Sequence, residues 1–127
     1  MRLSRLSLTG AALIAALSLA ACESPEERAE SHYQRAVTLL ADGESDRAAI
    51  ELRNALQSNA GHVGARYEYA QLLRSRGDIQ GAVGQFLRLV ETDPNHVEGQ
   101  IALAQMAVDM RDVPAVERHG ARAYELA

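Results

Sequence analysis

Residues 63–96 read VGARYEYAQLLRSRGDIQGAVGQFLRLVETDPNH, and their pattern points to the basic structural unit of this chain. Apolar residues recur at three- and four-residue spacing on both sides of Gly77-Asp78, which is typical of two amphipathic helices. Glycine ends a helix well because it tolerates a left-handed backbone, and aspartate caps the start of the next helix. The segment therefore predicts a helical hairpin.

The same pattern returns when the chain is shifted by 34 residues. Equivalent positions are Tyr33 and Tyr67, Gly43 and Gly77, Ala48 and Ala82, Leu52 and Phe86, and Leu89 and Ala123. The shift divides the chain into units 29–62 and 63–96 and an incomplete unit 97–127. Each hairpin leaves an apolar face bare, so stacking of about three units is needed for a stable core.

These units resemble the tetratricopeptide repeat, which places small residues, a turn glycine, an aromatic residue and a proline at set offsets. The second unit matches this signature best, through Ala70, Leu73, Gly77, Ala82, Phe86 and Pro94. The resemblance implies an all-α fold of tandem hairpins that form a short right-handed superhelical solenoid. The third unit departs from it, with Arg111 at the turn glycine and Gly120 at the aromatic position. Because a polar capping helix is also missing, we expect this chain to be the opening section of a longer solenoid.

Helix boundaries follow from local signals. Ser24-Pro25-Glu26-Glu27 is a capping box with proline at the first helical position, so we expect a helix to begin at Pro25 and to end near Gly43. Ser45 or Asp46 can cap the next helix, and Asp78 and Asp112 can cap later ones.

The N-terminus is typical of an exported protein. Arg2 and Arg5 precede an uncharged, Ala- and Leu-rich core at residues 6–19 that is too short to span a bilayer comfortably. Leu19-Ala20-Ala21-Cys22 resembles the lipobox of bacterial lipoproteins, which implies that residues 1–21 are a signal peptide and that Cys22 carries the lipid. Residues 22–28 would then be a short tether. The alternative is an ordinary secretory signal.

The resemblance places the protein in the bacterial cell envelope, anchored to a lipid membrane through Cys22 and facing the periplasm. Glu23 is not the aspartate typical of inner-membrane retention in enteric bacteria, which favours the outer membrane. Loss of the two basic residues of the signal peptide lowers the formal net charge from −4 to −6. Such an acidic chain is a poor ligand for nucleic acid, whose phosphates need a basic surface.

The inner groove of such solenoids is lined by the first helix of each hairpin, so the resemblance implies a protein-binding groove at equivalent positions. Its predicted residues are Tyr33, Val37 and Leu40 from the first unit, Tyr67, Gln71 and Arg74 from the second, and Ile101 and Gln105 from the third, with Glu30, Glu98 and Val108 beside them. Tyrosine, aliphatic, Gln and Arg side chains suit a protein or peptide partner. The alternative is that both tyrosines only pack between repeats.

His62 and His96 occupy equivalent turns, but no third ligand stands at a supporting spacing, so we predict no metal site. His32 and His119 are expected to be solvated helix residues. No phosphate loop, dinucleotide fingerprint or nucleophile elbow is present in the sequence, so we predict neither a cofactor nor a catalytic residue.

The function predicted from the sequence is that of a membrane-anchored scaffold, not an enzyme. Residues 47–57, RAAIELRNALQ, are similar to repeats of lipoproteins from exopolysaccharide and exosortase-type sorting systems, and less closely to those of secretion and assembly systems. Two alternatives stay open: the adaptor end of a longer enzyme, and a structural spacer between membrane and cell wall.

Overall fold

The computed structural model describes residues 23–127, so the predicted signal peptide and Cys22 lie outside the described residues. Six helices make up this part of the chain: α1 (Pro25–Ala41), α2 (Ser45–Ser58), α3 (Val63–Ser75), α4 (Ile79–Thr92), α5 (Val97–Asp109) and α6 (Val113–Leu126). The prediction of an all-α fold is confirmed over this range.

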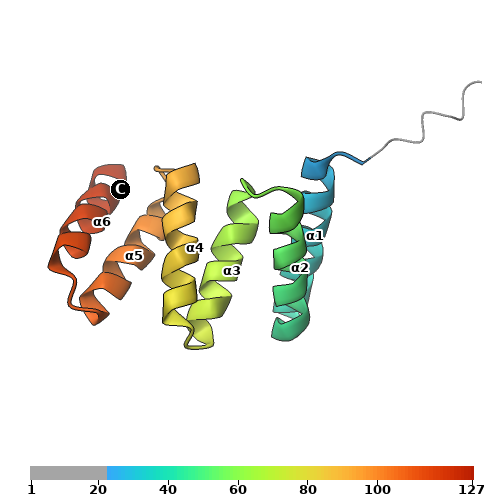
Figure 1. The fold of residues 1–127 in the computed structure, drawn as a ribbon, viewed down its shortest axis with the longest axis horizontal. Coiled ribbons are helices and arrows are strands. Elements are labelled where there is room, and N and C mark those ends of the chain that lie inside the picture. The colour runs from blue at the N-terminus through green and yellow to red at the C-terminus, as the bar shows by residue number, and fades with distance from the viewer. Residues whose placement is uncertain (1–22) are drawn as a thin grey trace, which may run out of the picture.

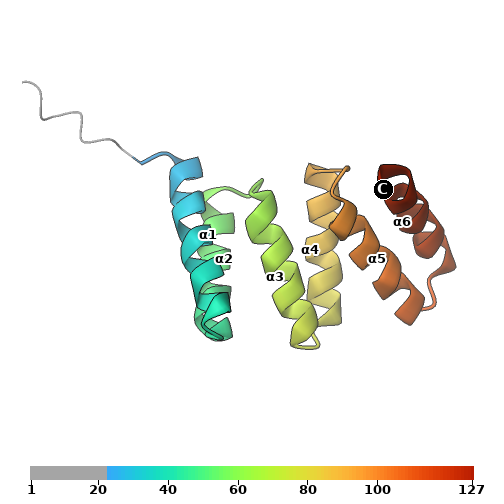
Figure 2. The same cartoon turned by 180° about the vertical axis from the view of Figure 1, so that it is seen from behind.

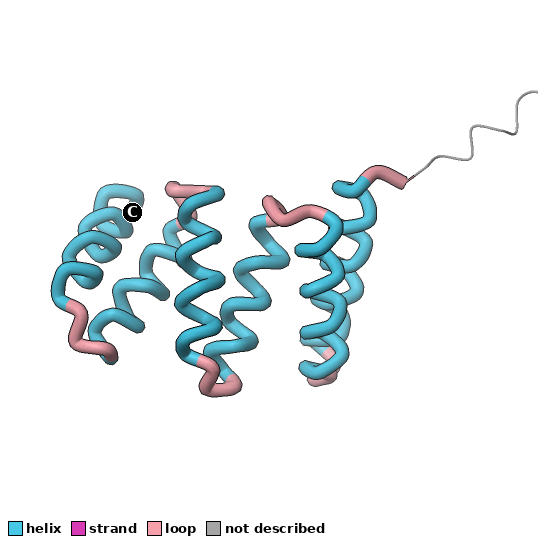
Figure 3. The backbone as a smooth tube through the Cα atoms, viewed as in Figure 1, coloured by secondary structure: helices cyan, strands magenta, loops and turns pink. Residues whose placement is uncertain are grey.

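The helices form three antiparallel hairpins, α1–α2, α3–α4 and α5–α6, which follow one another in a row (Figure 1). The turns within hairpins lie along one edge of the row, and the connections between hairpins lie along the opposite edge (Figure 3). Figure 2 shows the side on which α1, α3 and α5 face the viewer. This arrangement is the predicted solenoid of tandem hairpins, and it presents two long faces, one made by the first helices and one by the second.

The helix ends show why the chain folds back where it does. Glu27 N donates to Ser24 Oγ at 3.1 Å and Ser24 N donates to Glu27 Oε2 at 2.7 Å, so the predicted capping box and the start at Pro25 are confirmed. The turns after α1 and α3 contain Gly43 and Gly77 with φ of 77° and 80°. Left-handed backbone of this kind suits glycine because it has no Cβ.

The prediction that Ser45 or Asp46 caps α2 is wrong. Glu44 holds the N-cap position without a side-chain bond, and Ser45 is already helical. The Asp46 carboxylate instead accepts from Arg76 Nη2 of the next hairpin at 2.7 Å. The caps expected at Asp78 and Asp112 are confirmed, since these carboxylates accept from Gly81 N and Ala115 N at 2.9 and 3.1 Å.

The core lies between the hairpins and combines small residues with three large ones. Phe86, Leu52 and Leu89 are the largest fully buried side chains, and each contributes roughly 1.5–3 kcal/mol by leaving water. Alanines at helix contacts are fully buried and allow close approach: Ala29, Ala36, Ala48, Ala55, Ala65, Ala70 and Ala82. This packing fixes the relative position of neighbouring hairpins and hence the shape of both faces. Within residues 23–127, no helix has the length and apolarity that a membrane crossing requires.

Candidate functional site

The predicted groove residues all lie on the first helices, and each is either exposed or half-buried. Val37 on α1 and Ile101 on α5 are exposed, at 39% and 41% of their surface, and Gln105 is exposed as well. Leu40 is half-buried and packs against the core between the first two hairpins. The exposed aliphatic side chains are thus the part of the predicted groove that is free to contact a partner.

Tyr33 lies half-buried at the junction of the first and second hairpins. Its ring stacks at a tilt on His62, with ring centroids 4.9 Å apart. Its phenol also lies against Gly64 so closely that a Cβ there would come within 2.9 Å. Burial, followed by the nearby carboxylates of Glu68 and Glu30, raises the pKa of Tyr33. Tyr33 therefore packs between hairpins and shows only part of its surface to the groove.

Tyr67 holds the equivalent place one hairpin further on. Its ring lies 5.1 Å from that of His96 and meets Phe86 edge-on at 6.1 Å. Its hydroxyl accepts from Gln71 Nε2 at 3.0 Å. Both tyrosines therefore pack between repeats, as the alternative interpretation predicted. Each aromatic pair contributes about 0.5–1.5 kcal/mol beyond the free energy gained by burying its apolar surface.

Two predicted groove residues from different hairpins contact each other. Arg74 Nη2 on α3 donates to Gln105 Oε1 on α5 at 3.3 Å. The bond is long and both groups are accessible, so a ligand carboxylate or carbonyl can replace it at little cost. This pair supplies the polar element of the groove beside the aliphatic side chains.

The repeat-equivalent histidines have a structural function. His62 Nδ1 accepts from Ala65 N at 3.0 Å and His96 Nδ1 accepts from Gly99 N at 3.1 Å, so each ring caps the helix that follows. His62 Nε2 also donates to Glu30 Oε2 at 3.0 Å, across the hairpin junction. Hydrogen bonds from Gln34 and then His62 lower the pKa of Glu30. Over residues 23–127 no cluster of three or more His, Cys, Asp or Glu side chains has the arrangement of a metal site.

A polar pair inside every hairpin escaped the sequence prediction. The bonds join side chains 19 residues apart: His32 to Glu51 at 2.6 Å, Arg66 to Gln85 at 2.8 Å and His119 to Gln100 at 2.8 Å. The prediction that His119 is solvated is therefore wrong, because its side chain is 7% exposed and its Nδ1 donates to Gln100 Oε1. Burial, and then the nearby Arg118, lower the pKa of His119. The 34-residue shift contained the signal, since polar residues recur at both positions of the pair.

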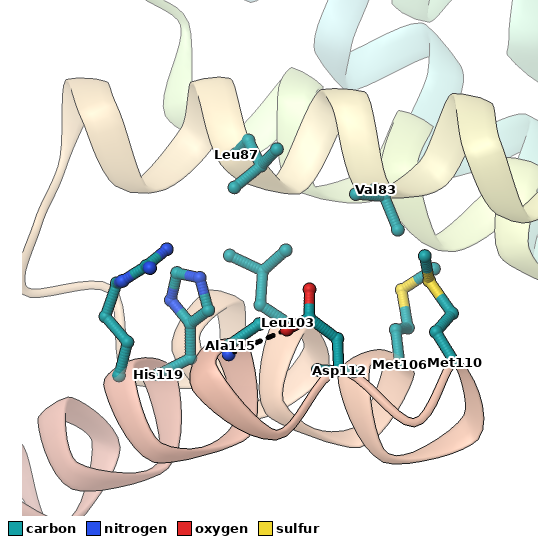
Figure 4. Close-up of a pocket in the computed structure, with 10 residues that line it drawn as sticks. Val83, Leu87, Leu103, Met106, Met110, Asp112, Ala115 and His119 are labelled. Carbon is teal, nitrogen blue, oxygen red and sulfur yellow. Dashed lines mark hydrogen bonds between the residues drawn. The ribbon is translucent and has the colours of Figure 1, made fainter.

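An apolar pocket of about 160 Å³ opens between α4 and the third hairpin (Figure 4). Val83 of α4 lies opposite Met106 and Met110 at one end of the pocket, and Leu87 lies toward the other end, where His119 stands. The Asp112 carboxylate at its edge is occupied by the bond to Ala115 N that caps α6. A cavity of about 150 Å³ can take one benzene ring, so this pocket has room for one apolar side chain.

Comparison with protein families agrees with this architecture. A family model described as tetratricopeptide repeat matches residues 29–106, which is more than half of the chain. Among solved structures the chain is similar to the "MamA RS-1 ArsTM double mutant", at 18% sequence identity and a TM-score of 0.42. That match covers 77% of this chain and 74% of the other. No curated protein matches the chain.

Proposed function

Because this chain belongs to the tetratricopeptide repeat family, we propose that it is a non-catalytic scaffold that binds a protein or peptide partner along its first helices. We define the first-helix face by its exposed and half-exposed side chains: Tyr33, Val37, Tyr67, Gln71, Arg74, Ile101, Gln105 and Val108. Membership of the family supports protein binding in general. The first-helix face is the surface on which we expect this chain to bind its partner.

The observation that carries the proposal is the exposure of aliphatic side chains on helices that also bury apolar residues in the core. Val37, Ile101 and Val108 are 39%, 41% and 59% exposed, while Ala36, Ala102 and Ala107 beside them lie in the core. Tyrosine and arginine, the residue types enriched among the side chains that dominate binding energy, lie on the same face, and the exposed aliphatic groups beside them add apolar contact area. The Arg74–Gln105 pair adds a polar contact that fixes orientation.

This chemistry suits an amphipathic peptide or helix. The apolar side chains of the partner would lie over Val37 and Ile101. One carboxylate or carbonyl group of the partner would replace Gln105 as the hydrogen-bond acceptor of Arg74. Arginine recognises carboxylates well because its planar fork can donate two parallel hydrogen bonds.

The proposed test is a set of charge substitutions on the full-length protein. Val37→Glu and Ile101→Glu place charge on the first-helix face without disturbing a buried contact, whereas Tyr67→Glu would also damage packing against Phe86. Ile50→Glu on α2 is the matched control because Ile50 is 54% exposed on the other side of the first hairpin. Native-size complexes extracted from the cell envelope should shrink in the first two variants and stay unchanged in the control. Complexes that keep their size in all three variants would refute the proposed face.

Membrane anchoring through Cys22 is part of the proposal, and the sequence before α1 supports it. Three acyl chains would hold the protein firmly because each buried methylene contributes about 0.8 kcal/mol. Ser24, two residues after Cys22 in the sequence, already caps α1, so the first hairpin would lie close to the bilayer surface. Intact mass of the native protein and of a Cys22→Ser variant tests this: the variant should remain uncleaved and carry no lipid, and normal processing would contradict the proposal.

The cellular setting proposed is an envelope system for exopolysaccharide production or for secretion and assembly, on the strength of the similarity at residues 47–57. The alternatives predict other outcomes. An adaptor end of a longer enzyme predicts a native species much larger than the mature chain with a catalytic motif downstream. A structural spacer predicts that Ile101→Glu changes neither complexes nor phenotype.

The apolar pocket is a second candidate surface for a partner. Its position follows from Ala107, which stands where the preceding hairpins have Leu39 and Leu73 and so leaves space beside Met106 and Met110. One leucine or phenylalanine of a partner fits a volume of about 160 Å³. Met110→Asp, at an exposed position, should abolish binding there, and an unchanged affinity would rule the pocket out.

A further inference from the structure

Three arginines line one pocket on the opposite side of the molecule from the predicted groove residues. The pocket, of about 280 Å³, lies among α2, α3 and α4 and is lined by Arg53, Leu56, Gln57, Ala60, Arg66, Tyr69, Gln85 and Arg88. No carboxylate is among the lining residues. Arg53 and Arg88 are exposed at its rim, and Arg66 is 7% exposed at its inner end.

The buried Arg66 has only neutral hydrogen-bond partners. Its guanidinium donates to Gln85 Oε1 at 2.8 Å and to the carbonyl oxygen of Ala60. Within residues 23–127, none of Arg53, Arg66 and Arg88 forms an ion pair with a carboxylate. Burial, and then the like charge of Arg88, lower the pKa of Arg66, and Glu91 acts more weakly in the opposite direction. A buried charge without a counter-charge is unfavourable. A bound anion would therefore supply the negative charge that the pocket lacks.

The equivalent junction one repeat further on lacks this arrangement. There Leu87 replaces Arg53 and Gln100 replaces Arg66, while Arg122 keeps the third position. Gln100 Nε2 makes the same kind of bond as Arg66, to the carbonyl oxygen of Pro94 at 3.2 Å. An uncharged amide thus satisfies the fold at this position, and the charge of Arg66 is not needed for packing. The chain is also acidic overall, with a formal net charge of −4, so three converging arginines are a local feature.

We propose that this pocket binds an oxyanion, the phosphate or carboxylate group of a ligand, between Arg66 at its inner end and Arg53 and Arg88 at its rim. Guanidinium groups bind such anions through charge-assisted hydrogen bonds. The amides of Gln57 and Gln85 add donors, and Leu56 and Tyr69 form an apolar wall for the rest of the ligand. The site is separate from the first-helix face, so it holds or fails independently of the proposed protein partner.

The experiment is a titration of the full-length protein with inorganic phosphate and, separately, with acetate, each at constant ionic strength against chloride. Binding is followed by NMR through the arginine Nε–Hε signals. We expect saturable shifts at the three pocket arginines and an affinity about tenfold lower in Arg53→Gln and in Arg88→Gln. Arg118→Gln, an exposed arginine outside this pocket, is the matched control and should bind within about twofold of the unmodified protein.

The two probes also separate the sources of the anion. Tighter binding of phosphate assigns a phosphorylated ligand, and tighter binding of acetate assigns a carboxylate, and either result supports the site. Shifts that do not saturate with either anion would overturn it. Equal affinities in Arg53→Gln, Arg88→Gln and Arg118→Gln would overturn it as well, and neither outcome would bear on partner binding by the first-helix face.

Discussion

Arg66 on α3 donates a hydrogen bond of 2.8 Å to Gln85 on α4, 19 residues further along the chain. The same spacing joins His32 to Glu51 and Gln100 to His119, so each hairpin holds one polar pair between its two helices. The residue types differ in all three hairpins while the geometry repeats. The pair is therefore a property of the repeat in this chain and joins the two helices of each unit.

Removal of the acceptor in the second hairpin should be costly. Gln85→Ala leaves the buried Arg66 without its side-chain partner, and we expect the free energy of unfolding to fall by roughly 1–3 kcal/mol. Gln57→Ala is the control, because Gln57 is exposed on α2 and its loss should change stability by less than about 0.5 kcal/mol. Urea unfolding followed by circular dichroism measures both. Equal stabilities of the two variants would show that the pair contributes nothing.

Two glycine-to-alanine substitutions should have opposite effects. Gly77 has a φ of 80°, so a Cβ there costs about 1–2 kcal/mol. Gly84 lies inside α4 with open space around it, so alanine should stabilise the helix by about 0.5–1 kcal/mol. Thermal unfolding of Gly77→Ala and Gly84→Ala should shift the midpoint down and up, respectively, and a shift in the same direction would contradict the turn geometry.

Arg111 occupies the turn position held by Gly43 and Gly77 in the preceding hairpins, and its φ is 57°. A residue with a Cβ is strained there, so Arg111→Gly should raise the free energy of unfolding by up to about 1 kcal/mol. The gain is reduced by the greater freedom of glycine in the unfolded chain. Chemical denaturation at neutral pH tests the sign, and a loss of stability would mean that the arginine side chain makes a compensating contact.

Stability should depend on pH through His119. Its folded-state pKa is lowered, first by burial and then by Arg118, with Asp112 acting the other way. The unfolded state therefore takes up the proton first, and stability is fully present above about pH 6.5 and is lost as the pH falls toward the lowered pKa. Glu30 and Glu51, whose pKa values are also lowered, lose their contributions only below their ordinary value of 4.5. Urea midpoints between pH 7.5 and 5 should fall less in His119→Gln than in the unmodified protein, and parallel curves would contradict the assignment.

Much of the fold could be predicted because the signals are local. Helix ends depend on contacts within one turn of backbone, so the residue types at these positions predict them. Examples are Pro25 after Ser24, the turn glycines Gly43 and Gly77, and the caps Asp78 and Asp112. The error at Asp46 has a tertiary cause, since Arg76 of the next hairpin takes its carboxylate. Helix starts were thus predictable, whereas the choice between two partners for one side chain was not.

The surface features were harder to predict because they depend on which helices converge. The residues next to His119 in the sequence do not indicate that it is buried. His119 lies 34 residues after Gln85, and only this repeat equivalence indicates that it pairs with Gln100. Similarly, Arg53, Arg66 and Arg88 are far apart in sequence and meet only when α2, α3 and α4 stack. The predicted groove depends on the repeat register, which places Val37 and Ile101 at exposed positions, and its use by a partner stays a prediction.

The most direct measurement for the central proposal is site-specific photo-crosslinking in living cells, with p-benzoylphenylalanine placed at one position at a time. Positions 37 and 101 replace Val37 and Ile101 on the first-helix face, and position 50 replaces the similarly exposed Ile50 on α2. If the first helices bind a protein partner, positions 37 and 101 should give the same discrete crosslinked product and position 50 should give none. A product at position 50 alone, or no product at 37 and 101, would contradict the proposed binding face.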